Sequence, residues 1–384
     1  MNSPISISSK LPQVPTSIFA IMSKMANDYG AVNLSQGFPD FPVSEELISL
    51  VNKYMTAGLN QYGPMPGVLS LRGAISEKMK FLYGASYDPE NEITVTAGAT
   101  QALFTAIMAL IKEGDEVIVF TPAYDSYAPA IELSGGKPIF VQLETPDYKI
   151  NWEMVMKLVN SKTKMIIINS PHNPTGSILE KEDMMALEKI TRDNDILILS
   201  DEVYEHIIFD NYKHQSVSKF PELAKRSLIV GSFGKTFHAT GWKVGFCVGP
   251  ENLMKEFRKV HQFNVFSVNT PVQYALAEFM QNKENYVRIG GMYEKKRNLF
   301  IKSLEGSRFK VLPCHGTYFQ LLDYSEITKI PDTEFAEKLT KENKIASIPV
   351  SVFYSASIDK KVLRFCFAKT DETIIEAANI LKSI

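Results

Sequence analysis

Short apolar runs alternate with amphipathic segments through the middle of the chain. The apolar runs predict strands at residues 93–96, 116–120, 138–143, 165–169, 196–199, 228–230 and 244–248. Helical patterns lie between several of them, at residues 100–111, 126–133, 152–159 and 181–191. Because the strand runs are continuous and rich in β-branched residues, they suit a mostly parallel sheet that is buried on both faces. The alternation predicts an α/β fold with helices packed on each side of the sheet.

After Pro250 the pattern changes to longer helices and fewer strands. Helices are expected at 252–262, 272–280, 285–304, 333–342 and 372–382, with strands near 309–311, 318–322 and 363–367. We therefore expect a large domain at residues 46–280 and a smaller α+β domain at 281–384. The N-terminal segment, residues 1–45, begins with a run rich in proline and serine and has too few apolar residues for a core of its own. We expect it to join the small domain or to lie on a partner subunit.

Composition excludes several classes of function. The chain has 384 residues, of which 45% are hydrophobic, and a net charge of -2, so we expect no nucleic-acid partner. Its three cysteines lie far apart and its six histidines show no metal-binding spacing, so we expect no metal site. No segment reaches the about 18 apolar residues of a membrane span, and the first residues do not form a signal peptide. We expect a cytoplasmic protein without a membrane partner.

Lys235 is the most informative single residue. It lies in Ser232-Phe233-Gly234-Lys235, directly after an apolar run at 227–230, which predicts an amine at the end of a buried strand. An amine with a depressed pKa forms a Schiff base with an aldehyde cofactor. Most lysines are solvated surface charges, so this interpretation depends on partners elsewhere in the chain.

Asp201 and Tyr204 follow the strand predicted at 196–199. A carboxylate at a buried strand end needs a positive partner, which a protonated pyridine nitrogen supplies. The carboxylate in turn keeps that nitrogen protonated, and the ring then acts as an electron sink. The alternatives are a helix cap or a salt bridge for Asp201, and core packing for Tyr204 instead of donation to the 3-oxygen of the ring.

A phosphate site is predicted where Gly98, Ala99 and Thr100 follow a strand and open a helix. Exposed N–H groups at a helix start bind phosphate, and glycine allows close approach of the backbone. Ser232 and Lys243 add a hydroxyl and a positive charge. The alternatives are an ordinary strand-to-helix turn and a surface lysine.

Three further residues complete the candidate site. Tyr124 follows the next strand and can stack on a ring, although core packing is the rival explanation. Asn173 lies in a loop fixed by proline and glycine, which without a ligand is only a turn. Arg364 interrupts an apolar strand, where its planar fork suits a substrate carboxylate or a structural salt bridge.

Together these motifs resemble those of class I pyridoxal-phosphate aminotransferases of fold type I. The motifs stand in the same order: Gly98-Ala99-Thr100, Tyr124, Asn173-Pro174-Thr175-Gly176, Asp201-Glu202-Val203-Tyr204, Ser232 to Lys235, Gly241-Trp242-Lys243 and Arg364. Within that class the chain is similar to the group of kynurenine/glutamine transaminases and methionine aminotransferases, through residues 34–42, 60–63 and 261–271. The resemblance implies a large domain with a seven-stranded sheet flanked by helices, and a smaller α+β domain.

The resemblance also implies a role for each residue. Lys235 is the Schiff-base lysine and proton shuttle, Asp201 binds the ring nitrogen, Asn173 and Tyr204 bind the 3-oxygen, and Tyr124 stacks on the ring. Gly98, Ala99, Thr100, Ser232 and Lys243 bind phosphate, together with Tyr62 of a neighbouring subunit. Gly37, Asn173 and Arg364 hold the substrate carboxylate, while Phe19 and Phe266 (from the partner) wall the side-chain pocket. The implied assembly is a homodimer with shared active sites.

Two departures refine the expected activity. Lys243 stands where other class I members often have arginine, and Ser267 stands where kynurenine-type members often have histidine. The second departure favours the methionine-preferring branch. We therefore expect transfer of the amino group of methionine, glutamine or an aromatic amino acid to a 2-oxo acid. The alternatives are a carbon–sulfur β-lyase that uses the same site, and a non-catalytic regulator that binds the cofactor.

Overall fold

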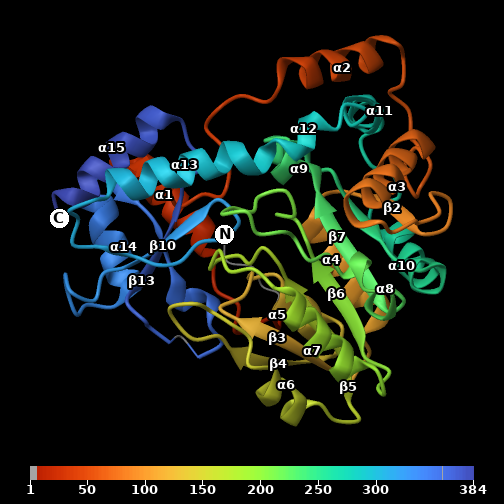
Figure 1. Ribbon diagram of the computed structural model, residues 1–384, viewed down its shortest axis with the longest axis horizontal. Coiled ribbons are helices and arrows are strands. Elements are labelled where there is room, and N and C mark those ends of the chain that lie inside the picture. Colours follow the sequence, from red (N-terminus) through yellow and green to blue (C-terminus); the bar gives the residue numbers. More distant parts are fainter. Residues whose placement is uncertain (1–6, 357) are drawn as a thin grey trace.

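A seven-stranded sheet forms the centre of the computed structural model, which describes residues 7–356 and 358–384 (Figure 1). The strand order is β2-β8-β7-β6-β5-β3-β4. The strands are β2 (Ile93–Thr96), β3 (Glu116–Thr121), β4 (Lys137–Gln142), β5 (Thr163–Asn169), β6 (Leu197–Asp201), β7 (Ser227–Ser232) and β8 (Gly245–Val248). β8 runs antiparallel to both of its neighbours, β2 and β7, and every other pair of neighbouring strands in this sheet is parallel. The predicted α/β fold with a mostly parallel sheet is confirmed.

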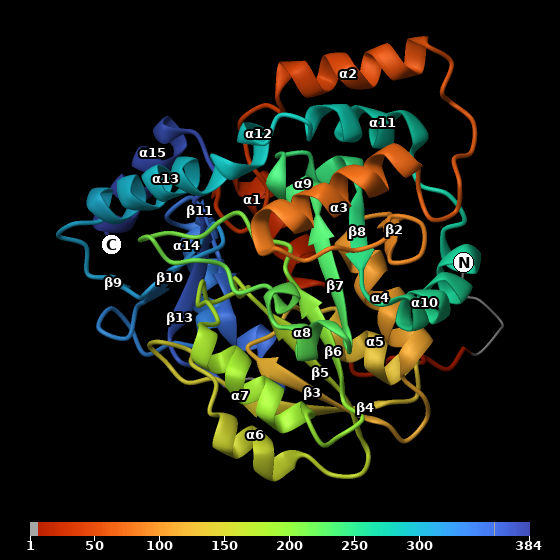
Figure 2. The same ribbon diagram turned by 45° about the vertical axis from the view of Figure 1, so that its right-hand side comes forward.

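Alternate residues of the strands face two separate cores. In β3, Val117 and Val119 pack in one apolar cluster, while Ile118 and Phe120 pack in the other. This period of two is the normal geometry of a strand whose two faces are both covered. The first cluster includes α4 (Ala99–Leu110), α5 (Tyr127–Leu133) and α10 (Glu251–Asn264). The second includes α3 (Leu69–Tyr83), α6 (Trp152–Leu158), α7 (Lys181–Thr191), α8 (Pro221–Ala224) and α11 (Thr270–Phe279) (Figure 2).

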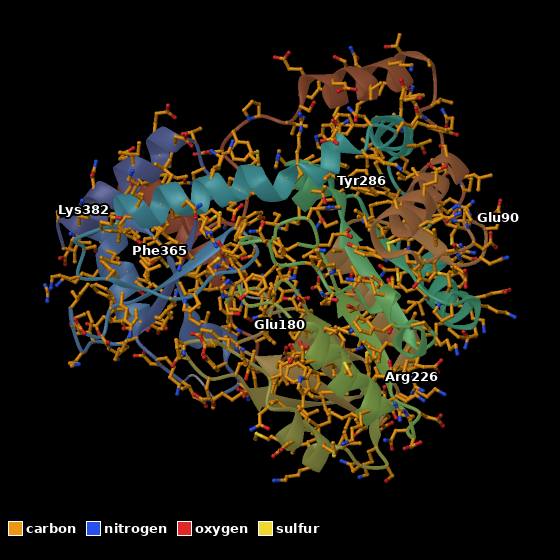
Figure 3. All side chains as sticks on the ribbon, in the orientation of Figure 1. Glu90, Glu180, Arg226, Tyr286, Phe365 and Lys382 are labelled. Atoms are coloured by element: carbon orange, nitrogen blue, oxygen red, sulfur yellow. The ribbon has the colours of Figure 1, made fainter. Side chains whose placement is uncertain are left out.

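The C-terminal part of the chain forms a second sheet of four strands in the order β12-β13-β10-β9. Its strands are β9 (Lys310–Val311), β10 (Phe319–Asp323), β12 (Ile348–Pro349) and β13 (Val362–Cys366). The helices α13 (Ile289–Ser303), α14 (Asp332–Lys341) and α15 (Asp371–Lys382) pack on it, and Phe365 lies inside the resulting apolar cluster (Figure 3). Short 3-10 turns are η1 (Val217–Lys219), η2 (Thr240–Trp242) and η3 (Val350–Phe353).

The prediction of a single helix at 285–304 is wrong. The chain forms α12 (Glu284–Val287) and then α13, with a break at Arg288, where ψ is -10°. Gly290, the second residue of α13, lies against the backbone of an earlier loop. A Cβ on Gly290 would lie 3.1 Å from the carbonyl oxygens of both His206 and Ile208. The bend and the absence of a side chain allow α13 to approach that loop closely.

The N-terminal segment packs on the C-terminal elements. The helix α1 (Ile18–Tyr29) contacts α14 (Figure 1). The strand β1 (Val32–Asn33) pairs in parallel with β11 (Ile345–Ala346). Leu34, just beyond β1, is fully buried in the C-terminal apolar cluster. The helix α2 (Glu45–Thr56) then packs on α11. Of the proline- and serine-rich start, residues 1–6 lie outside the described residues. Within the described part of the chain, every helix is too short or too polar to cross a bilayer.

Replacement of Leu34 by alanine tests this packing. The cavity left in the C-terminal cluster is expected to lower the free energy of unfolding by about 2–5 kcal/mol. Ile7→Ala is the matched control, because Ile7 is 84% exposed. Denaturant titration measures both variants. Equal stability of the two variants would contradict the packing described here.

Candidate active site

A cavity of about 190 Å³ opens where the carboxyl ends of β5, β6 and β7 meet. In open α/β sheets, ligands bind beyond these strand ends. Ten of the residues predicted from the sequence line it: Gly98, Ala99, Thr100, Tyr124, Asn173, Asp201, Tyr204, Ser232, Lys235 and Lys243. Segments far apart in the sequence therefore meet in one space.

Lys235 lies in the short helix α9 (Phe233–Thr236), directly after β7. Ser232 caps this turn through a hydrogen bond from the Lys235 backbone N–H. The Lys235 Nζ donates to the carbonyl oxygen of Gly37 at 3.1 Å and to the hydroxyl of Tyr318 at 2.9 Å. Burial of the amine, with the charges of Arg364 and Lys243 nearby, lowers its pKa to about 8. A substantial fraction of the amine is therefore neutral and nucleophilic close to physiological pH.

Asp201 ends β6 and is 3% exposed. One carboxyl oxygen accepts a hydrogen bond from the Tyr127 hydroxyl at 2.6 Å, and the other accepts one from the Val203 N–H at 3.3 Å. Burial raises the pKa of Asp201 to about 6 despite these donors. No lysine, arginine or histidine of the described chain forms an ion pair with it. The carboxyl group thus suits a cation brought by a ligand.

The turn between β2 and α4 forms a cradle for an anion. Gly98 has a φ of +81°, and a Cβ there would lie 3.2 Å from the Lys243 Nζ. A Cβ on Gly245 would in turn meet the Ala99 backbone nitrogen at 2.9 Å. Both glycines therefore allow the cation and the free N–H groups of the helix start to converge. The Thr100 hydroxyl adds a polar group and lies 3.2 Å from the Tyr124 hydroxyl.

Arg364, in β13, is 1% exposed. Its Nη1 donates to the Asn173 side-chain oxygen at 2.8 Å, and its Nη2 donates to the Ser35 carbonyl at 3.1 Å. Within the described part of the chain, its Nε has no hydrogen-bond partner. Burial lowers the pKa of the guanidinium to about 10. The guanidinium packs on the ring of Phe319 at 3.9 Å and lies 5.2 Å from that of Phe19. A buried cation with a free donor suits a carboxylate ligand.

Tyr62 and Phe266 do not lie among the residues that line the cavity. Their rings contact each other at 5.3 Å, and their side chains are 82% and 53% exposed. The single chain does not test their predicted contribution to a neighbouring subunit, which stays a prediction.

Sequence reasoning missed two tyrosines of the site. Tyr127 bonds Asp201, and Tyr318 bonds Lys235. Tyr127 lies three residues after Tyr124, and in a helical turn this spacing places two side chains on the same side. That spacing is the sequence signal that could have identified Tyr127. Nothing in the sequence around Tyr318 distinguishes it from a core tyrosine, because its partner is distant in the chain.

Comparison with known proteins agrees with this geometry. Residues 29–381 match the family model "Aminotransferase class I and II". The methionine aminotransferase of Escherichia coli is 46% identical, over all of both chains. A solved structure of an E. coli protein with a methionine aminotransferase function superimposes with a TM-score of 0.97, covering 99% of this chain and 100% of that one. Human kynurenine–oxoglutarate transaminase 1 is 34% identical, over 91% of this chain and 92% of its own.

The chain belongs to the class I and II aminotransferases. Members of this family depend on pyridoxal phosphate. The residues of the cavity fit that group on physical grounds, because they offer an amine of lowered pKa for its aldehyde, a carboxyl without an ion-pair partner in the described chain for its ring nitrogen, and a cradle for its phosphate. Among the described residues, no cluster of histidine, cysteine or acidic side chains could hold a metal ion.

Asp201→Asn is expected to have opposite effects on stability and on cofactor binding. The pKa of Asp201 is about 6 in the folded chain, above the ordinary aspartate value of 3.8, so the folded state binds more protons between pH 4 and 6. Stability of the cofactor-free aminotransferase therefore falls as pH rises through that window. Above pH 6, removal of the charge is expected to stabilise the cofactor-free protein by about 1–3 kcal/mol.

The same substitution removes the partner of the ring nitrogen and is expected to weaken binding of pyridoxal phosphate. Thermal unfolding at pH 4 and pH 8, combined with equilibrium dialysis of the cofactor, measures both effects. At pH 4 the two cofactor-free proteins should be equally stable. A variant that is less stable at pH 8 and binds the cofactor normally would contradict this account of Asp201.

Proposed function

We propose that this aminotransferase moves the amino group of L-methionine, or of glutamine or an aromatic amino acid, to a 2-oxo acid. The observation that carries the proposal is the single cavity that brings Lys235 and Asp201 together beside the buried Arg364. The 46% identity over the full length to the E. coli methionine aminotransferase supports methionine as the donor. The family favours transamination over the β-lyase and the regulator.

Pyridoxal phosphate supplies an aldehyde that reacts with amines and a cationic ring that accepts electrons from the α-carbon. Lys235 would hold the aldehyde of this cofactor, and its Nζ, when free, would act as the base that takes the α-proton of the substrate. Asp201 holds the ring nitrogen, and Tyr124 packs against the ring. Asn173 and Tyr204 bind the 3-oxygen.

The phosphate is assigned to one set of residues: Gly98, Ala99, Thr100, Ser232 and Lys243. We assign the substrate carboxylate to Arg364, Asn173 and Gly37, because the free Nε of Arg364 needs an acceptor. Phe19 lies beside that guanidinium and offers an apolar wall. Such a wall favours methionine, glutamine or aromatic side chains over the second carboxylate of aspartate.

We further propose a homodimer in which Tyr62 reaches the phosphate and Phe266 the side-chain pocket of the partner. The exposed contact between these two rings supports this assignment, since a surface aromatic pair suits a protein interface. We assign residues 46–280 to the large domain, 281–384 to the small domain, and 1–45 to a segment that joins the small domain. A cytoplasmic location is part of the same proposal.

Arg364→Lys tests the carboxylate site. Lysine keeps the charge but loses the two-pronged geometry, so kcat/KM for methionine is expected to fall by about 10²-fold or more. Arg226→Lys is the matched control, because the Arg226 guanidinium binds the carbonyls of Asn194 and Ile196 away from the cavity (Figure 3). Steady-state kinetics of both variants measure kcat/KM for methionine. Equal kcat/KM values for the two variants would contradict the role of Arg364.

A panel of amino donors tests the substrate class. With one 2-oxo acid as acceptor, methionine, glutamine and phenylalanine are expected to exceed aspartate by about 10²-fold in kcat/KM, because an acidic side chain must be desolvated against an apolar wall. A cysteine conjugate without added 2-oxo acid tests the β-lyase, whose products are pyruvate and ammonia. Preference for aspartate would overturn the substrate proposal, and release of pyruvate at a comparable rate would favour the lyase.

A further inference from the structure

Three buried acids lie in the turn that follows β6, and only one of them faces the cavity. Asp201 and Tyr204 line the cavity, together with the valine between them, whereas Glu202 and Glu205 do not. The turn is closed by hydrogen bonds from the Glu205 N–H to the Glu202 carbonyl at 2.9 Å and from the Ile207 N–H to the Tyr204 carbonyl at 2.8 Å. The turn therefore presents some side chains to the cavity, while its two glutamates are buried against the rest of the protein.

Glu205 is bound by α3. Lys78 forms an ion pair with Glu205, and the two side chains are 3% and 5% exposed. The Tyr83 hydroxyl donates to the second carboxyl oxygen. Burial alone would raise the pKa of Glu205, but Lys78, His206 and Tyr83 together bring it down to about 2. The carboxylate is thus charged and held at every working pH.

Glu202 is fixed in the same way. It accepts hydrogen bonds from the Ser200 hydroxyl at 2.8 Å and the Val217 N–H at 3.1 Å, and it lies 2.8 Å from the His214 Nε2. The turn therefore has an anchor on each side of Tyr204. Only the Glu205 anchor reaches a separate helix, through a pair of opposite charges.

Tyr204 is the cavity residue that depends most directly on the Glu205 anchor. It precedes Glu205 in the chain, is 2% exposed, and packs its ring edge-on against Tyr318 at 5.1 Å. Tyr318 in turn bonds the Lys235 Nζ. A backbone shift at Glu205 would move the Tyr204 hydroxyl, and hydrogen bonds weaken steeply with distance and angle.

We propose that Glu205, held by Lys78, is a positioning residue that sets the place of the Tyr204 hydroxyl at the 3-oxygen of the cofactor. The inference rests on the proposed function of Tyr204. A donor at that oxygen stabilises its negative form and so makes the nitrogen that joins Lys235 to the cofactor release its proton more readily. Displacement of the donor raises the pKa of that nitrogen. The absorbance of the bound cofactor, which changes when the nitrogen loses its proton, then changes at a higher pH.

The experiment measures the pH midpoint of that absorbance in the cofactor-loaded protein, together with the cofactor dissociation constant and the melting temperature. Tyr204→Phe is expected to raise the midpoint by about 1 unit, since it removes the donor. Glu205→Gln and the double variant Lys78→Met/Glu205→Gln are expected to raise it by at least about 0.5 unit, because the anchor is lost. The double variant should melt higher than Lys78→Met alone, since it leaves no buried charge without a partner.

Ile75→Ala is the control for a purely structural role. Ile75 is fully buried on α3 close to Lys78 but does not contact the turn through a charge. The Ile75→Ala substitution should lower the melting temperature and leave the pH midpoint of the absorbance unchanged. Glu205→Asp, which keeps the charge but shortens the side chain, should fold and still raise the midpoint.

The inference is overturned if Tyr204→Phe moves the midpoint while Glu205→Gln, Glu205→Asp and the double variant do not. It is also overturned if Ile75→Ala moves the midpoint as far as they do, because loss of stability would then explain the effect. A midpoint that is unchanged in Tyr204→Phe would instead show that the proposed function of Tyr204 is wrong, and the inference would fall with it.

Discussion

The separation of two buried ionisable groups, the amine of Lys235 and the carboxyl of Asp201, governs this structure. Asp201 ends β6 and Lys235 lies just after the neighbouring strand β7, and both line the same cavity, yet each is held by neutral partners. Lys235 binds a carbonyl and a hydroxyl, and Asp201 binds a hydroxyl and an N–H. A direct ion pair would keep the amine protonated and satisfy the carboxyl. The fold instead leaves an amine whose pKa is lowered to about 8 and a carboxyl that can accept a cation.

This arrangement requires most of the chain. The central sheet supplies the floor of the cavity through β5, β6 and β7, whereas the contacts to Lys235 come from Gly37 and from Tyr318 beside β10. The N-terminal segment is tied to the C-terminal sheet by β1, β11 and the buried Leu34. The same segment provides the carbonyl of Ser35 that holds Arg364. The packing of Leu34 is thus linked to the positions of Lys235 and Arg364 through the backbone carbonyls of Gly37 and Ser35.

Local patterns were sufficient to predict the seven strands of the central sheet, but not the two-residue strands β1, β11 and β12. Asp201 and Lys235 follow continuous apolar runs, and parallel strands bring their carboxyl ends to one edge. Patterns could not reveal Tyr318 or the anchor of Glu205, since both depend on partners more than 80 residues away. The break at Arg288 was missed because it follows from the approach of Gly290 to another loop. The predicted role of the surface aromatics Tyr62 and Phe266 concerns a neighbouring subunit, so a single chain does not test it.

The most direct test of the central claim is chemical trapping at the amine. The protein loaded with pyridoxal phosphate is reduced with borohydride, digested, and mapped by mass spectrometry. The account predicts one label, on Lys235 in the peptide that contains Ser232-Phe233-Gly234. A label on Lys243 or Lys78 in its place, or no label at all, would contradict it.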